Sequence, residues 1–230
     1  MRDDDADAHT RPRPEAAKAA KQAAKAPKQA AKAPTSRYVV ATFNRDKAAE
    51  LLALLALPGV ELVPLPDWPG AVAPAETGDT LLANARLKAR AAVALTGLPA
   101  IADDTGLEVD ALHGAPGIHA ARYAGPEATY AENVAKLLRE LAGVAAEQRT
   151  ARFRTVCFAA WPDGTEMSAD GVLEGTITDS PRGANGFGYD PVFVPKGETR
   201  TVAELTDAEK NAISHRARAV RVMRKLLLVA

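Results

Sequence analysis

The chain contains one cysteine, no excess of either charge and no long apolar run. Cys157 can form neither an internal disulfide nor a multi-cysteine zinc site, which fits a reducing compartment. Basic and acidic residues each number 29, which excludes a uniformly basic nucleic-acid coat or a uniformly acidic chain. No stretch approaches the roughly 18 apolar residues of a membrane helix, and the N-terminus lacks the apolar segment of a secretory signal. We therefore expect a soluble, cytoplasmic protein with no membrane contact.

Residues 1–36 differ in composition from the rest of the 230-residue chain. They carry eight basic and five acidic residues, a net charge of +3, which leaves −3 for the remainder. The string KQAAKAP occurs twice, at 21–27 and 28–34, and the only apolar residues are Ala, Pro and Met1. Such a segment cannot bury enough surface to offset the entropy of ordering. We expect 1–36 to be a disordered tail and 37–230 to form one domain; the alternative is a basic arm that contacts nucleic acid or anionic lipid.

Apolar periodicity predicts alternating strands and helices from residue 37 onward. Strands are expected at 37–43, 60–65 and 99–104, and an antiparallel hairpin at about 151–178 with Asp163-Gly164 at its turn. One helix is expected after Asn44, and a second at 79–97, capped by Asp79 or Thr80. A third helix is expected to carry on one face Tyr130, Val134, Leu137, Leu138 and Leu141. A last helix is expected from Thr206, with the apolar stripe Ile213, Val220, Met223 and Leu227. Residues 66–78 and 105–128 are expected to be irregular. This is an α/β chain with a mixed sheet, whose ligand sites should lie beyond the carboxyl ends of the strands.

Two polar clusters follow predicted strands. The first cluster, Thr42-Phe43-Asn44-Arg45-Asp46-Lys47, lies at the start of a predicted helix, where free N–H groups and a lysine favour phosphate binding. The alternative is that Asn44 caps the helix and the segment binds no ligand. The second cluster is Asp103-Asp104-Thr105-Gly106, with Glu76 earlier in the chain. Its carboxylates indicate Mg²⁺ or a general base, or alternatively a turn. Because neighbouring strand residues point to opposite faces, Asp103 and Asp104 can share a site only if the strand ends there.

Two further clusters lie in the last third of the chain. In the glycine-rich segment 183–191, Phe187 and Tyr189 offer faces for a nucleobase, or else they fill the core. In the segment 210–216, Lys210, His215 and Arg216 would suit an anionic, hydrogen-bonding ligand, or else they form a solvated helix face. Together, the four clusters indicate a nucleotide site.

The order and wording of these segments resemble the inosine/xanthosine triphosphate pyrophosphatase family, which acts on non-standard purine nucleotides. The matching strings are VVATFNRDKAAEL, ETGDTLLANARLKARAA, GLPAIADDTGLEVDALHGAPGIHAARYAG, ARFRTVCF, GTITDSPRGANGFGYDPVFVP and ELTDAEKNAISHRARA. They span about residues 38–221, and the FGYDP and EKNAISHR strings are highly specific. The resemblance implies a two-lobed α/β fold, a mixed sheet with flanking helices, a central nucleotide cleft and a homodimer. It also implies Mg²⁺-dependent hydrolysis of dITP, ITP or XTP to the monophosphate and pyrophosphate.

The resemblance also implies a role for each motif residue. Segment 42–47 would hold the triphosphate through Thr42, Asn44 and Lys47, and Lys88 and Thr105 would lie on the phosphate side. Glu76 and Asp104 would bind Mg²⁺, with Asp104 also accepting the proton of the attacking water. The base would be held by Phe187, Gly188, Tyr189 and Asp190, with polar contacts from Lys210, His215 and Arg216.

Four positions depart from the family pattern. Phe43 and Ala217 stand where glycine is usual, Ala83 where glutamate is common, and Thr105 where serine is usual. A side chain at Phe43 must point away from the phosphate loop or shift its geometry. Two other functions remain open: a binding protein that uses the basic tail without turnover, and a related pyrophosphatase that clears modified pyrimidine nucleotides.

Overall fold

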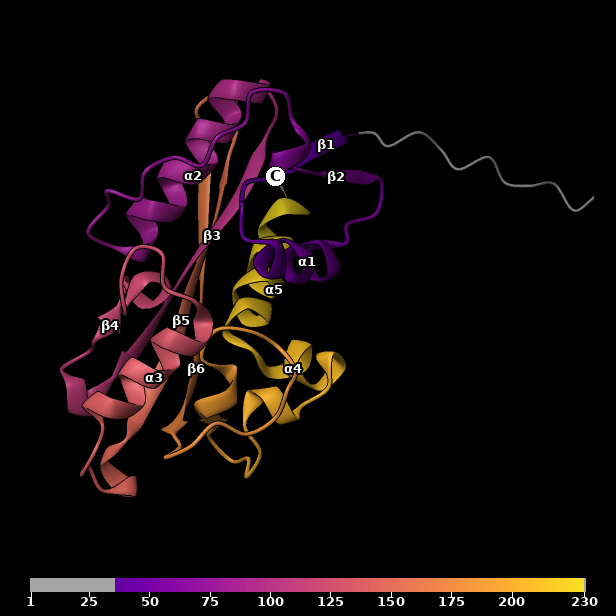
Figure 1. The fold of residues 1–230 in the computed structure, drawn as a ribbon. Helices are drawn as coiled ribbons and strands as arrows, with labels where there is room; N and C mark the ends of the chain where they lie inside the picture. Colours follow the sequence, from indigo (N-terminus) through magenta and orange to yellow (C-terminus); the bar gives the residue numbers. More distant parts are fainter. Residues whose placement is uncertain (1–35, 230) are drawn as a thin grey trace, which may run out of the picture. The chain divides into compact units, whose positions relative to one another are not determined.

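The computed structural model describes residues 36–229, which form a curled mixed sheet flanked by helices (Figure 1). The strands are β1 (Ser36–Val40), β2 (Val60–Pro64), β3 (Ala100–Val109), β4 (Pro116–Gly117), β5 (Thr150–Ala160), β6 (Glu166–Ile177) and β7 (Phe193–Pro195). The α-helices are α1 (Arg45–Leu55), α2 (Leu81–Thr96), α3 (Tyr130–Glu140), α4 (Asp207–Ile213) and α5 (His215–Leu227). The tail expected at 1–36 lies outside the described residues, except for Ser36, which begins β1.

The strand order is β2-β1-β3-β5-β6-β7, with β4 paired to β3. Strand β1 runs parallel to β2 and β3, and all other pairs are antiparallel. This confirms the expected α/β class and mixed sheet. The β5–β6 hairpin turns at Gly164, whose φ is +90°, so the predicted Asp163-Gly164 turn is also confirmed.

Strand β3 is longer than the sequence predicts. It continues five residues past Asp104 to Val109, because it pairs with β5 along its whole length, from Ala100 opposite Ala160 to Val109 opposite Ala151. The prediction that the chain becomes irregular at residue 105 is therefore wrong. Strand β1, by contrast, ends at Val40 instead of 43.

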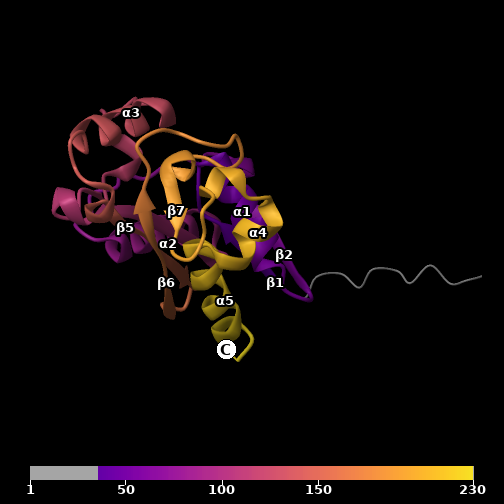
Figure 2. The same ribbon diagram turned by 90° about the horizontal axis from the view of Figure 1, so that it is seen from below.

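Helices cover both faces of the sheet (Figures 1 and 2). Helix α2 packs through Ala85 and Ala89 on one face, and α1 and α5 pack through Leu51 and Met223 on the other. A third apolar cluster, which includes Leu137 of α3, surrounds the far ends of the long strands. The core is thus divided between the two ends of the sheet, in agreement with the expected two-lobed arrangement.

Helix boundaries follow local capping. The Thr80 hydroxyl accepts a bond from the Ala83 N–H, and Gly97 ends the helix in a left-handed conformation, so the helix expected at 79–97 is confirmed. The single helix expected from Thr206 is instead two, because Ser214 is extended and caps α5. A serine hydroxyl can stabilise a new helix start within an otherwise helical pattern.

Among residues 36–229, no helix is both long and apolar enough to cross a membrane.

Candidate functional site

The segment between β1 and α1 is ordered by its own side chains. The Thr42 hydroxyl accepts a bond from the Asn44 N–H at 3.2 Å, and the Asn44 side-chain oxygen accepts from the Lys47 N–H at 3.0 Å. Asn44 is therefore a helix cap, and its amide nitrogen remains for a second contact. Phe43 is 37% exposed, and its φ is not positive, so the bulky side chain fits this backbone without left-handed strain.

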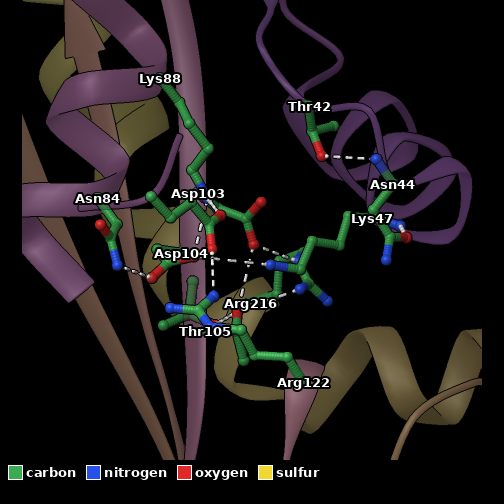
Figure 3. Close-up of polar contacts among 12 residues, drawn as sticks. Thr42, Asn44, Lys47, Asn84, Lys88, Asp103, Asp104, Thr105, Arg122 and Arg216 are labelled. Carbon is green, nitrogen blue, oxygen red and sulfur yellow. Dashed lines mark hydrogen bonds and ion pairs between the residues drawn. The ribbon is translucent and has the colours of Figure 1, made fainter. Parts of the chain in front are cut away.

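Glu76 and Asp104 converge on one ammonium group, that of Lys88, which lies beside Asp104 in Figure 3. Lys88 of α2 lies 2.8 Å from Asp104 Oδ1 and 3.2 Å from Glu76 Oε1, and Asn84 approaches the other Asp104 oxygen at 3.5 Å. Burial alone would raise the pKa of Glu76, but the charge and hydrogen bond of Lys88 outweigh it and lower that pKa. Burial likewise opposes the charge of Lys88, yet Asp104 and its neighbours raise its pKa. The two predicted metal-binding carboxylates thus already share one cation.

Asp103 and Asp104 have different partners because β3 continues beyond them. Asp103 is fully buried and accepts a bond from Arg216 Nε of α5 at 2.9 Å, whereas Asp104 contacts Lys88 of α2. Lys47 lies near both, with its Nζ 4.0 Å from Asp104 Oδ1. Burial would raise the pKa of Asp103, but Lys47 and Arg216 hold it far below its usual range.

Arg216 is the centre of a buried polar network. It is 1% exposed and bonds Asp103, the Thr105 hydroxyl at 3.2 Å and the carboxylate of Glu50. The Thr105 hydroxyl also lies 2.6 Å from that of Thr155. The alternative of a solvated helix face is therefore excluded for Arg216.

The glycine-rich loop places Phe187 and Tyr189 in different surroundings. Tyr189 is buried in the core, and its hydroxyl donates to the carbonyl of Ala120 at 2.8 Å, so the core-filling alternative holds for this ring. Phe187 is only partly buried, and its N–H donates to Asp190 at 2.9 Å. Gly186 has a φ of +70°, and a Cβ there would meet the Asp190 carboxylate at 2.2 Å, so this close approach requires glycine.

Lys210 and His215 line one cavity together with Phe187. Lys210 bonds Asp190 at 2.6 Å and Glu50 at 2.7 Å, and its ammonium lies 4.6 Å from the centre of the Phe187 ring. Burial raises the pKa of Asp190 despite this lysine. His215 is buried, and burial together with nearby cations lowers its pKa well below 6.5, so the ring is neutral at neutral pH. Its Nδ1 has no hydrogen-bond partner in the part of the chain that the structure describes.

Two adjoining cavities bring the predicted residues together. One is lined by Lys47, Thr105, His215, Arg216 and the loop 187–190, and the other by the segment 41–44, Lys47, Glu76 and Lys88. Asn44, Lys47 and Ala121 line both. The predicted phosphate and base segments therefore form one continuous cleft. Arg45 and Asp46 are exposed at the start of α1 and line neither cavity.

Three residues that contact the side chains of the cleft lie outside the four motif clusters, and of these three only Tyr130 lines a cavity. Glu50 joins Arg216 to Lys210, and Arg122 bonds Glu76 Oε2 at 3.1 Å. Tyr130 was expected on the apolar face of the third helix, but it is 39% exposed and lines the cavity. The contacts of all three are with residues distant in the sequence, so no local pattern indicates them. For Tyr130, the Thr129–Glu132 capping pattern indicates only that this residue lies at the start of a helix.

Comparisons with known proteins show the family to which the chain belongs. The model of the Ham1 family matches residues 38–226. A dITP/XTP pyrophosphatase of Geobacillus kaustophilus (strain HTA426) is 52% identical over 182 residues, covering 79% of this chain and 89% of that protein. A dITP/XTP pyrophosphatase of Streptomyces coelicolor is 49% identical over 198 residues, covering 84% and 99%. The solved structure of a HAM1 protein from Coxiella burnetii is 41% identical with a TM-score of 0.77, and the match covers 85% of this chain and 100% of that one. This chain belongs to the Ham1 family.

Proposed function

We propose that this protein hydrolyses deaminated purine nucleoside triphosphates (dITP, ITP, XTP) to the monophosphate and pyrophosphate. The observation that carries the proposal is the pair Glu76 and Asp104, which share one cation in a cleft that continues to Phe187 and His215. Two relatives that are 52% and 49% identical to this chain over 79% and 84% of its length are named dITP/XTP pyrophosphatase. The cleft thus combines groups for phosphate with groups for a base.

Charge balance supports a divalent cation in this reaction. Ten charged side chains contact one another along the cleft: Lys47, Lys88, Arg122, Lys210 and Arg216, with Glu50, Glu76, Asp103, Asp104 and Asp190. The five positive and five negative groups cancel. A bound triphosphate would therefore leave an uncompensated negative charge, which a divalent cation reduces.

Glu76 and Asp104 fit a site for Mg²⁺. Their oxygens are hard donors, and both already lie within 3.2 Å of one cation, the Lys88 ammonium. No group of three or more acidic, His or Cys side chains that could hold a metal occurs within residues 36–229. Two carboxylates with oxygens from substrate and water are a usual arrangement for this ion. When bound, Mg²⁺ would neutralise phosphate charge and help orient the phosphates.

The protein's own residues perform the remaining tasks. Lys47 and the start of α1 bind the phosphates, because helix N-termini and buried cations favour anions. Asp104, oriented by Lys88, accepts the proton of the water that attacks the phosphoanhydride bond. No covalent nucleophile is needed, since phosphoryl transfer depends mainly on positioning and charge stabilisation.

Base recognition falls to the side of the cleft around Phe187. The Phe187 ring offers a stacking surface, and the neutral ring of His215 lines the same cavity. Lys210 lies beside both and suits a purine 6-keto oxygen. One buried donor left unpaired by a wrong base costs about 1–3 kcal/mol, so several such contacts are needed for strong discrimination.

The deciding experiment measures pyrophosphate release with Mg²⁺ from ITP, dITP, XTP, ATP, GTP and dTTP. We expect strong preference for the first three, and loss of turnover in Asp104→Asn with an unchanged circular dichroism spectrum. Asp170→Asn is the matched control, because this carboxylate is exposed on β6. Preference for dTTP would favour a pyrimidine-clearing enzyme, and full activity of Asp104→Asn would exclude the role given to that residue.

We further propose that the active form is a cytoplasmic homodimer. The nucleotide substrate places the activity in the compartment of nucleotide synthesis, and the buried free thiol of Cys157 is consistent with a reducing environment. Light scattering during size-exclusion chromatography tests the dimer, and a mass of about 24.1 kDa would identify a monomer.

A further inference from the structure

Tyr130 connects three parts of the chain that meet at the cleft. It is the first residue of α3, directly after the capping Thr129, and the buried face of this helix is formed by Val134 and Leu137. Its ring centre lies 5.8 Å from that of Phe187, in the glycine-rich loop. A large aromatic side chain that is 39% exposed at a cavity wall is available to a ligand.

The phenol of Tyr130 is bonded to the start of α1. Its oxygen accepts a hydrogen bond from Asn44 Nδ2 at 2.9 Å and donates to Asp46 Oδ2 at 3.0 Å. The other atom of the Asn44 amide caps α1. Tyr130 therefore spans the distance between the segment proposed to bind phosphate and the ring proposed to bind the base.

The part of a nucleotide that lies between phosphate and base is the sugar. We infer that Tyr130 is a positioning residue for the nucleoside part of the substrate, with its ring against the sugar and its hydroxyl fixed by Asn44 and Asp46. This inference rests on the proposed function. It assigns a role to a residue outside all four motif clusters.

The role predicts a specific pattern of binding losses. An aromatic contact of this kind contributes about three- to tenfold in affinity, so Tyr130→Ala should weaken IMP binding about tenfold. Tyr130→Phe keeps the ring and should lose only about threefold. Inorganic pyrophosphate, which has no nucleoside, should bind both variants as it binds the wild type. In turnover of ITP, KM should rise with kcat changed less than about threefold, because the effect lies in binding and not in chemistry.

The experiment titrates the full chain with IMP and with pyrophosphate by calorimetry, and measures pyrophosphate release from ITP. Tyr123→Phe is the control, since its phenol contacts Glu140 and does not line the cavity. IMP binding by Tyr130→Ala within twofold of wild type overturns the inference, as does an equal loss of pyrophosphate affinity or a fall in kcat at constant KM. A wild-type chain that neither binds IMP nor hydrolyses ITP overturns the proposed function together with it.

Discussion

Replacing Arg216 by methionine tests whether the charge of this side chain stabilises the fold. The guanidinium is 1% exposed and bonds the fully buried Asp103, so the substitution leaves a carboxylate in the interior without its main partner. Breaking one side of a buried pair costs about 3–5 kcal/mol. In a domain of this size each kcal/mol lowers Tm by about 2–4 °C, which gives a fall of roughly 6–20 °C.

Urea unfolding followed by circular dichroism measures this loss. Arg221→Met is the control, because this exposed arginine of α5 should change the free energy of unfolding by less than about 0.5 kcal/mol. Combining Arg216→Met with Asp103→Asn removes both charges, so the double variant should be more stable than the sum of the single losses by about 1–3 kcal/mol. Additive losses, or a loss below about 1 kcal/mol for Arg216→Met alone, would refute the pairing.

Three further results are expected. Lys88→Met removes the cation that Glu76 and Asp104 share, so the affinity for Mn²⁺ in the absence of nucleotide should rise about tenfold, as measured by electron paramagnetic resonance. An unchanged affinity would contradict the proposal that the metal binds these two carboxylates. Excess EDTA should abolish pyrophosphate release and added Mg²⁺ should restore it, whereas activity that persists in EDTA would exclude a metal requirement. Folding lowers the pKa of His215, so below pH 6.5 the unfolded chain binds more protons than the folded one. The free energy of unfolding should therefore fall as the pH drops below 6.5, by at most about 1.4 kcal/mol per pH unit. In urea titrations between pH 7 and 5, His215→Gln should reduce this dependence of stability on pH, and an unchanged dependence would show that the ring is not buried in its neutral form.

Local signals were sufficient to predict several elements of the fold. The helix ending near Gly97 and the hairpin at Asp163-Gly164 depend on capping and turn chemistry within a few residues, so the sequence alone predicted them. The extent of β3 depends on β5, some 50 residues later, and Thr105-Gly106 resembles a turn when that partner is unknown. A strand's length is set by its pairing partner as much as by its own residues.

The candidate site divides in the same way. The motif residues Lys88 and Phe187 line the cleft, and Asp104 lies directly behind Lys88, to which it is bonded. The side chains that balance the charges of the cleft could not be inferred, because in the sequence Glu50 cannot be distinguished from an acidic residue on an exposed helix surface. Whether it is buried against Arg216 is decided by α1 and α5 packing on the same face of the sheet.

Lys47 differs from the other cleft cations in a way that bears on phosphate binding. Arg216, Lys210 and Lys88 each bond two carboxylates at 3.2 Å or less, whereas the ammonium of Lys47 lies 4.0 Å from its nearest ion-pair partner, Asp104. Burial lowers the pKa of Lys47, and Asp103 offsets this only in part. An incoming phosphate would supply the close anion that this partly exposed group lacks, and would raise its pKa. Lys47 therefore gains more from a bound triphosphate than the cations that are already paired, and it lies where the two cavities meet.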